Sequence, residues 1–313
     1  MTRIALVVNA AKADGEQAQA LCSQVAAVCA EAGWPAPDLR STSPDDPGTA
    51  AAQAAIAAGA DLVVACGGDG TVNAVAQALA GTGVRLGIVP LGTGNLLAAN
   101  LGIPTDPGAA IRVLTDGADR RIDLGRTGER VFAGIAGLGL DAAMVAGVSA
   151  ILKKRLGWPA YIVPIVRHLP DRGVTLTLDL DGRRVRHYGV RTLLIGNIGR
   201  VHGGLDLLPG ADPADGVLDV VLLAPRGLLL GWISVVIHLA RRSDHTPDTI
   251  TRYRARRIVV RTRHAVEQEL DGEPYRCAAE LEVEVLEGAL YIRVPADRLG
   301  ETTADTAAES AAL

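Results

Sequence analysis

Residues 61–73 read Asp61-Leu-Val-Val-Ala-Cys-Gly67-Gly68-Asp69-Gly70-Thr71-Val72-Asn73. A short apolar run is followed by three glycines within four positions, and then by apolar residues at helical spacing. Glycine permits positive φ and lets other groups approach the backbone closely. A helix N-terminus offers free N–H groups to an anion. The stretch therefore predicts a strand, a glycine-rich turn and a helix that bind phosphate. A sharp turn without a ligand is the alternative.

A second glycine turn, Pro90-Leu91-Gly92-Thr93-Gly94-Asn95, follows another short apolar run. Neither turn has the spacing of the common P-loop or dinucleotide motifs. Two glycine turns that follow two parallel strands are expected side by side at the carboxyl edge of the sheet, where α/β proteins bind ligands. The side chain of Asn95 is expected to cap the helix that follows.

Composition limits the class of protein. The 313 residues suggest about two domains, and 49% hydrophobic with 21% charged residues indicates a globular chain. A net charge of −4 argues against a nucleic-acid-binding protein. The four cysteines lack metal-binding spacing and are expected to be reduced and buried, in a cytoplasmic protein. The longest apolar segment, Leu228–Ala240, is too short to span a bilayer, so any membrane contact is expected to be peripheral.

The pattern of elements changes along the chain. Strands alternate with helices over residues 1–120, which predicts βαβ units and a parallel sheet. Strands dominate from residue 174, with Asp181-Gly182 as a hairpin turn, so residues 121–299 are predicted to form a mainly antiparallel β domain. Residues 300–313 lack an apolar period and are predicted to be disordered.

Two acidic stretches of the second domain are candidates for chemistry. Pro209–Asp219 contains three aspartates among glycines, which suits a hard cation, with an Asp-rich turn before a strand as the alternative. Leu270-Asp271-Gly272-Glu273 places two carboxylates around a glycine, which suits a base and a metal contact, with a hairpin turn as the alternative. His202 is expected to be a loop residue. The six arginines of residues 252–263 are expected to cover solvated strand faces, with contact to anionic headgroups as the minority interpretation.

Four blocks in order resemble the diacylglycerol kinase catalytic-domain family, in particular its soluble bacterial lipid kinases, which are related to sphingosine kinases and distantly to NAD kinases. The blocks are Gly67–Asn73, Pro90–Asn95, Gly203–Asp219 and Leu270–Glu273. The resemblance implies an N-terminal α/β nucleotide-binding domain and a C-terminal β-sandwich-like domain, with the active site in the cleft between them.

The resemblance also implies roles for residues at matching positions. ATP contacts are implied for Asn9, Thr42, Gly67, Gly68, Asp69, Gly70, Thr71, Val72, Asn73 and Thr93. Mg²⁺ is implied at Asp215, at the backbone carbonyls of Asp212 and Val217, and through water at Asp123. We assign Asp69 to a Mg²⁺–water network with Asp123. Glu273 is the implied proton acceptor, with Asp271 beside it. Ala10 replaces a proline of the family, so the contacts of the first loop depart from its pattern.

The expected function is transfer of the γ-phosphoryl group of ATP, with Mg²⁺, to a hydroxyl of a lipid such as diacylglycerol. Another glycerolipid or a sphingoid base is equally compatible with the sequence. The expected partners are the lipid substrate, a peripheral membrane surface and a second copy in a homodimer. Segments 139–169 and 228–239 are candidates for acyl-chain contact, with core packing as the alternative. An NAD kinase and a nucleotide-binding regulatory protein without turnover are the rival functions.

Overall fold

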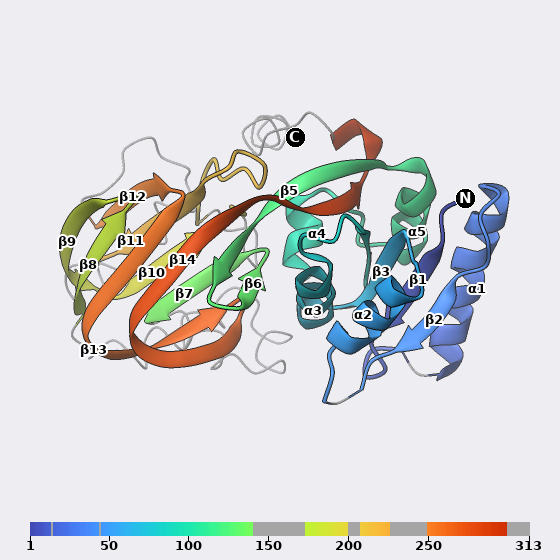
Figure 1. Cartoon of the computed structure of the whole chain (residues 1–313), viewed down its shortest axis with the longest axis horizontal. Helices are drawn as coiled ribbons and strands as arrows, with labels where there is room; N and C mark the ends of the chain where they lie inside the picture. The colour runs from blue at the N-terminus through green and yellow to red at the C-terminus, as the bar shows by residue number, and fades with distance from the viewer. Residues whose placement is uncertain (14, 44, 140–172, 200–206, 226–248, 299–313) are drawn as a thin grey trace.

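The computed structural model describes residues 1–13, 15–43, 45–139, 173–199, 207–225 and 249–298. Figure 1 shows two lobes side by side, an α/β lobe that contains the N-terminus and a β-rich lobe. The segments 139–169 and 228–240, His202 and the predicted disordered tail lie wholly or almost wholly outside the described residues. Within the described part of the chain, none of the helices has the length and hydropathy that a membrane span requires.

The α/β lobe has the parallel sheet that the sequence predicts. Its strands run in the order β2-β1-β3-β4, and each neighbouring pair is parallel. The strands are β1 (Ile4–Val8), β2 (Asp38–Ser41), β3 (Leu62–Gly67) and β4 (Arg85–Pro90). The helices are α1 (Gly15–Glu31), α2 (Thr49–Ala57), α3 (Asp69–Leu79), α4 (Leu96–Asn100) and α5 (Pro107–Asp116). Full burial of β1 and β3 explains their continuous apolar runs.

The second lobe is mainly antiparallel, as predicted. The first of its strands are β5 (Ala118–Thr127), β6 (Arg130–Phe132), β7 (Ile135–Gly139), β8 (Val174–Leu180) and β9 (Arg183–Val190). They are followed by β10 (Thr192–Gly196), β11 (Leu218–Leu223), β12 (Ile250–Ala255), β13 (Arg257–Leu270) and β14 (Glu273–Val294), and by the short 3₁₀ helix η2 (Ala296–Arg298). Asp181 and Gly182 both have positive φ in the two-residue β8–β9 turn, which confirms the predicted hairpin.

Strand β14 joins the two lobes. It pairs with β13 in the β lobe, and its far end pairs in parallel with β4 through Tyr291 and Ile292. The sequence suggests two strands, Leu281–Leu286 and Ala289–Val294, but these form one continuous strand. The interruption is a bulge against β5 between Leu286 and Leu290, where Gly288 has a φ of 51°. The chain therefore bends there without leaving the sheet, and β5 and β14 cross together between the lobes (Figure 1).

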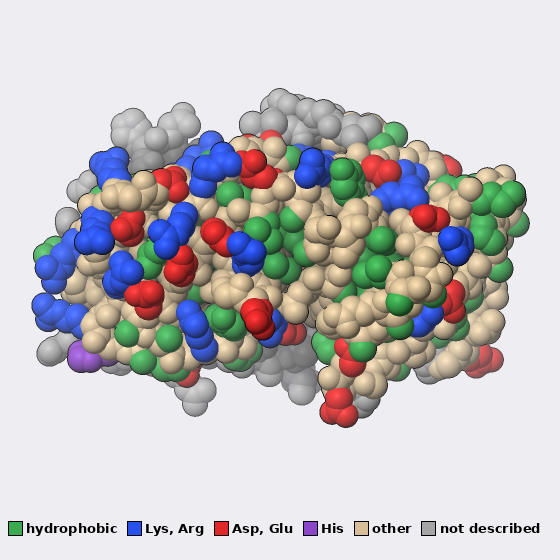
Figure 2. All heavy atoms as spheres, in the orientation of Figure 1, with side chains coloured by type: hydrophobic (Ala, Val, Ile, Leu, Met, Phe, Trp, Pro, Cys, Tyr) green, Lys and Arg blue, Asp and Glu red, His purple; other side chains and the backbone are tan. Residues whose placement is uncertain are grey.

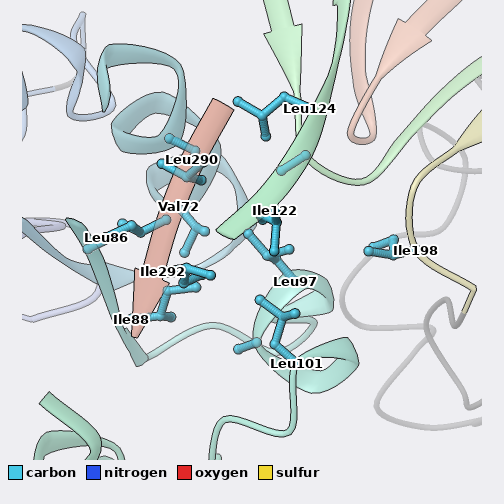
Figure 3. Close-up of a cluster of buried hydrophobic side chains, with 14 of the residues drawn as sticks. Val72, Leu86, Ile88, Leu97, Leu101, Ile122, Leu124, Ile198, Leu290 and Ile292 are labelled. Carbon is cyan, nitrogen blue, oxygen red and sulfur yellow. The ribbon is translucent and has the colours of Figure 1, made fainter. Parts of the chain in front are cut away.

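One hydrophobic core spans the junction of the lobes. Figure 3 shows Val72 and Leu97 of the α/β lobe packed near β5 and β14, with Ile198 contributed by the segment after β10. A second core fills the β lobe, and a third lies between the parallel sheet and helices α1 and α5. Each fully buried aliphatic side chain contributes about 1.5–3 kcal/mol. The shared core therefore holds the glycine-turn elements in a fixed relation to β5 and β14.

Cysteine burial is only partly as expected. All four cysteines are free, and Cys29 and Cys66 are buried, but Cys22 is half-buried and Cys277 is exposed. Cys277 lies on β14 opposite Glu267 of β13, in a stretch of the hairpin where most side chains are open to solvent. The expectation of four buried cysteines is therefore wrong at Cys277.

Candidate functional site

The two glycine turns lie against each other. Gly67 and Pro90 are register partners at the ends of β3 and β4, and the amide of Leu91 donates to the carbonyl of Gly67 at 2.8 Å. A Cβ atom added at Gly92 would lie 2.6 Å from the Cα atom of Gly68. Only glycines allow this approach, so the predicted side-by-side arrangement at the carboxyl edge of the sheet is confirmed.

The carboxylate of Asp69 connects the two turns. It accepts hydrogen bonds from the backbone amides of Asn95 at 3.0 Å and of Leu96 at 2.6 Å. These are free amides at the start of α4, so Asp69 caps that helix from a distant position in the chain. The prediction that the Asn95 side chain caps α4 is wrong. Asn95 is left-handed, with φ 49°, and its amide group instead accepts from the N–H of Gly92 and donates to its carbonyl.

The first loop of the chain reaches the same edge of the sheet. The side-chain amide of Asn9 donates to the hydroxyl of Thr71 at 2.8 Å. The backbone amide of Ala10 donates to the hydroxyl of Thr42 at 3.3 Å. Asn9, Thr42 and Thr71 are therefore held in one cluster beside the glycine turn, although Ala10 replaces the proline expected there.

The remaining predicted nucleotide contacts differ in what they present. Val72 is 3% exposed and packs in the core of Figure 3, so its side chain faces away from any ligand. Asn73 is half-buried on α3, and Thr93 is exposed in the second turn. Gly68 is the N-cap of α3, and its carbonyl accepts from the amides of Thr71 and Val72. The amides at the start of α3 provide the donors that suit a phosphate group.

Asp271 and Gly272 form the two-residue turn between β13 and β14. Both have positive φ, as a type I′ turn requires, so the hairpin interpretation of this stretch is confirmed. The carboxylate of Asp271 accepts from the amides of Ala133, Gly134 and Ile135 at 2.8–3.0 Å. Burial raises the pKa of Asp271 to about 6, against the opposing effect of these three hydrogen bonds, and the charge of Asp69 raises it further.

Glu273, the first residue of β14, faces the glycine loop. A Cβ atom added at Gly70 would lie 3.2 Å from Oε1 of Glu273. The exposed carboxylate of Glu273 thus occupies space that the glycine leaves free at the start of α3. This close approach brings the predicted phosphate loop of one lobe and the predicted base of the other lobe together.

The buried carboxyl of Asp271 should make stability depend on pH. A folded pKa of about 6, above the ordinary aspartate value of 3.8, means that the native state binds more protons than the unfolded state between these values. The contribution of Asp271 to the unfolding free energy should therefore fall as pH rises from about 4 to about 6, and then level off. Urea denaturation of the wild type and of Asp271→Asn across this range tests the prediction.

The stability difference between the wild type and Asp271→Asn should shrink as pH rises, and a difference that grows would contradict the assignment. Asp181→Asn in the exposed β8–β9 turn is the matched control, because it makes the same substitution at the same turn position.

The acidic loop before β11 is organised around Arg254 of β12. The guanidinium of Arg254 forms ion pairs with the carboxylates of Asp215 and Asp219. The side chain of Asp219 is only 14% exposed, and its Oδ2 atom is buried without a hydrogen-bond partner in the described part of the protein. Burial raises the pKa of Asp219 to about 6, although Arg254 opposes this shift and Asp215 adds to it.

The other predicted metal-site residues frame this loop. The carboxylate of Asp212 pairs with Arg120 at 3.0 Å, and the amide of Val217 donates to Asp215 at 3.2 Å. Asp123 is 3% exposed, and its two carboxylate oxygens accept from the amides of Gly216 at 2.7 Å and of Gly288 at 2.6 Å. Asp123 therefore ties the acidic loop to the bulge of β14.

The carboxylates of the acidic loop are of the right kind for Mg²⁺, but they are few. Asp215 and Asp219 are neighbouring hard oxygen donors, and the buried Oδ2 of Asp219 lacks a partner among the described residues. Among those residues, however, no group of three His, Cys, Asp or Glu side chains is placed to enclose an ion. Mg²⁺ commonly takes one or two carboxylates and keeps several waters, so the loop fits a partly hydrated ion.

An open hollow of about 690 Å³ lies elsewhere, beside Gly81, Arg121, Glu287 and Tyr291. None of the predicted site residues lines it. We therefore base the functional site on the glycine turns, the Asp271 turn and the acidic loop.

An α/β lobe with paired glycine turns, set against a β lobe that supplies carboxylates, is the arrangement of a two-lobed kinase. Comparison with known families makes this specific. The diacylglycerol kinase catalytic domain matches residues 3–127, and the YegS C-terminal NAD kinase beta sandwich-like domain matches residues 134–294. The chain belongs to this family of lipid kinases.

Individual relatives agree with the family assignment. A protein of Pseudomonas putida named "Probable lipid kinase YegS-like" is 33% identical over 77% of this chain and 80% of its own length. A diacylglycerol kinase of Mycobacterium tuberculosis is 36% identical over 54% of this chain and 57% of its own length. The solved structure of a diacylglycerol kinase from Bacillus anthracis shares the fold, with a TM-score of 0.72 and 20% identity over 93% of this chain and 96% of that one.

Sequence reasoning missed several residues that organise the site. Arg254 looked like one of six similar arginines, yet it holds Asp215 and Asp219. Asp219 lies in the block Gly203–Asp219, but the family resemblance implies no role for it. Asn197, which donates to the carbonyl of Asp123 and, at 3.5 Å, to that of Pro213 in the acidic loop, carried no signal beyond its place between Gly196 and Gly199. These roles depend on contacts between distant parts of the chain, which spacing along the sequence does not reveal.

Proposed function

We propose that this lipid kinase transfers the γ-phosphoryl group of ATP to the hydroxyl of a glycerolipid such as diacylglycerol, with Mg²⁺ as the metal. The observation that carries the proposal is the approach of Glu273 to Gly70, which sets a carboxylate beside a phosphate-type loop. The naming of a relative as a diacylglycerol kinase supports this acceptor. Phosphoryl transfer depends mainly on positioning and on neutralising charge, which this arrangement suits.

Each part of the site has its own role in the proposed reaction. Free amides at the start of α3 bind phosphate oxygens. Because Gly92 has no side chain, the two glycine turns can lie in contact, so both face the nucleotide. Asp69 fixes the second turn by capping α4. Glu273 accepts the proton of the lipid hydroxyl, and Asp271 holds the turn from which Glu273 projects.

Mg²⁺ would be held by Asp215 with Asp219 and the carbonyls of Asp212 and Val217. When bound, the ion neutralises phosphate charge. Arg254 pairs with the two aspartates in this structure. The involvement of Asp69 and Asp123 through bound water stays part of the proposal. In the structure their carboxylates are engaged by backbone amides at two different places.

The direct test is incubation of the full chain with γ-labelled ATP, Mg²⁺ and a panel of acceptors, followed by product separation. Labelled phosphatidic acid from diacylglycerol is the expected product. If the label appears on a sphingoid base or another glycerolipid, that lipid is the acceptor in place of diacylglycerol. Label on NAD would favour the NAD kinase alternative. ATP binding without transfer to any acceptor would favour a regulatory protein.

The substitution Gly70→Ala should separate activity from stability. Alanine is the better helix former by about 0.5–1 kcal/mol, so the variant should be at least as stable as the wild type. Its Cβ atom, however, would lie 3.2 Å from Oε1 of Glu273 and should displace that flexible carboxylate. We expect kcat to fall about tenfold or more with a melting temperature at or above that of the wild type, because small misplacements of a reacting group are costly.

Gly108→Ala provides the matched control, because Gly108 is likewise the second residue of its helix, α5. It should gain similar stability and keep wild-type kcat. Full activity of Gly70→Ala would show that Glu273 does not act from its observed position.

Peripheral membrane contact is also part of the proposal. Figure 2 shows basic and acidic side chains interspersed over the β lobe. Within the run 252–263, arginines 254, 256, 257 and 261 form ion pairs with carboxylates, which supports the interpretation that they cover solvated strand faces. Among the described strands, β9 pairs with β8 alone, and it presents the exposed side chains of Arg183, Arg186 and the 66% exposed Tyr188. Arginine stacked on tyrosine suits an anionic headgroup layer.

The double variant Arg183→Ser/Arg186→Ser should therefore bind vesicles containing phosphatidylglycerol more weakly than the wild type does. The difference should vanish at high salt or on neutral phosphatidylcholine vesicles, because exposed charges are screened. Co-sedimentation measures the binding, and Arg112→Ser, which replaces an exposed arginine of α5, is the control. Equal binding of both variants would exclude β9 as the contact. A homodimer stays a proposal that light scattering can test.

A further inference from the structure

Asn197 lies between the acidic loop that precedes β11 and the Asp271 turn that joins β13 to β14. It follows β10, whose last residue, Gly196, is the register partner of Ile135 on β7 and of Asp219 on β11. Asn197 is 1% exposed. A polar side chain at this depth is costly unless its hydrogen bonds are made. The Nδ2 atom of Asn197 is paired, whereas its Oδ1 atom has no hydrogen-bond partner among the described residues, so the Nδ2 contacts indicate its role.

The side-chain amide of Asn197 donates to β5 and, over a longer distance, to the acidic loop. Its Nδ2 atom lies 2.7 Å from the carbonyl oxygen of Asp123 and 3.5 Å from that of Pro213. The amide of Asp123 donates to the same Pro213 carbonyl at 2.6 Å. Asn197 thus holds the start of the loop against β5, beside the hydrogen bond from Gly216 to the Asp123 carboxylate.

The backbone of Asn197 contacts the other loop. Its amide donates to the carbonyl of Gly134 at 3.0 Å. The amide of Gly134 in turn donates to Asp271 at 2.8 Å, and Asp271 forms the turn that precedes Glu273. One buried residue therefore connects two segments: the loop that carries Asp215, mainly through Asp123 of β5, and the turn that carries Glu273, through Gly134.

We propose that Asn197 is a positioning residue that sets the acidic loop relative to the Asp271 turn, from which Glu273 faces the glycine loop. This inference rests on the proposed function. Asn197 does not touch the substrate. Its side-chain donor fixes one loop while its backbone donor fixes the other, and an aliphatic residue supplies only the second of these contacts.

Asn197→Ala removes the side-chain donor, and Asn197→Asp places a carboxylate oxygen against the carbonyls of Asp123 and Pro213. We expect kcat to fall at least tenfold in both variants, with the KM for ATP within twofold of the wild type. We also expect weaker binding of Mn²⁺, used as the probe for the divalent site, in the presence of a non-hydrolysable ATP analogue. Its dissociation constant, measured by electron paramagnetic resonance, should rise about tenfold.

Ile195→Val is the matched control, because Ile195 is fully buried on β10, two residues before Asn197, and packs in the core of the β lobe. It should lower the melting temperature while leaving kcat and the Mn²⁺ dissociation constant unchanged. The proposal is overturned if Asn197→Ala keeps wild-type Mn²⁺ affinity, or if Ile195→Val weakens it equally. If the wild type phosphorylates no acceptor, the proposed function fails, and the Mn²⁺ comparison still decides the role of Asn197.

Discussion

Glu273→Gln is expected to lower kcat for lipid phosphorylation by about 10²- to 10⁴-fold, the range typical for loss of a general base. Glutamine keeps the size of the side chain, its place at the start of β14 and its contact distance to Gly70, but it cannot accept the hydroxyl proton. The KM for ATP should change little, because nucleotide binding depends on the glycine turns. Steady-state assays with varied ATP and saturating lipid separate the two constants.

Glu280→Gln is the matched control for this substitution. Glu280 lies on the same strand, is exposed and pairs with Arg261, away from the glycine turns. It should keep wild-type kcat. Glu273→Asp should be intermediate, because the base remains but its carboxylate is withdrawn by one methylene. Wild-type turnover in Glu273→Gln would exclude Glu273 as the proton acceptor.

The α/β lobe could be predicted closely because its signals are local. Helix α5, for example, begins at Pro107 behind the capping carboxylate of Asp106 and ends at Asp116 before Gly117, all of which are local features. The β lobe was predicted less completely. β12 was hidden within a run of arginines, and β14 was divided in two at a bulge. Neither feature has a local signature, because strand pairing is decided by partners far along the chain.

The site shows the same limit. The spacing of glycines and carboxylates identified the loops that meet, and the structure brings Gly70 and Glu273 together across 203 positions of sequence. What each carboxylate contacts could not be predicted. Asp69 caps a helix that starts 27 residues later, and Asp215 pairs with an arginine 39 residues away. Such contacts depend on how the lobes pack, so they require coordinates.

Gly92→Ala should have the second large effect. The added Cβ atom would lie 2.6 Å from the Cα atom of Gly68 and 2.8 Å from Oδ1 of Asn95. Backbone cannot yield as a flexible side chain can, so the two glycine turns must separate. Over-packing of this kind costs about 1–3 kcal/mol. Because the α3 amides and the second turn then no longer face the same phosphates, ATP affinity should fall about 100-fold, as calorimetric titration would measure.

Gly87→Ala distinguishes this local effect from a general loss of stability. Its Cβ atom would lie 2.6 Å from a methyl carbon of Leu114, so it also over-packs strand β4, but on side chains remote from the turns. Both variants should lower the melting temperature, whereas only Gly92→Ala should weaken ATP binding. If both lose affinity in proportion to their loss of stability, close contact between the turns is not what binds the nucleotide. If Gly92→Ala binds ATP normally, the phosphates lie elsewhere on the α/β lobe.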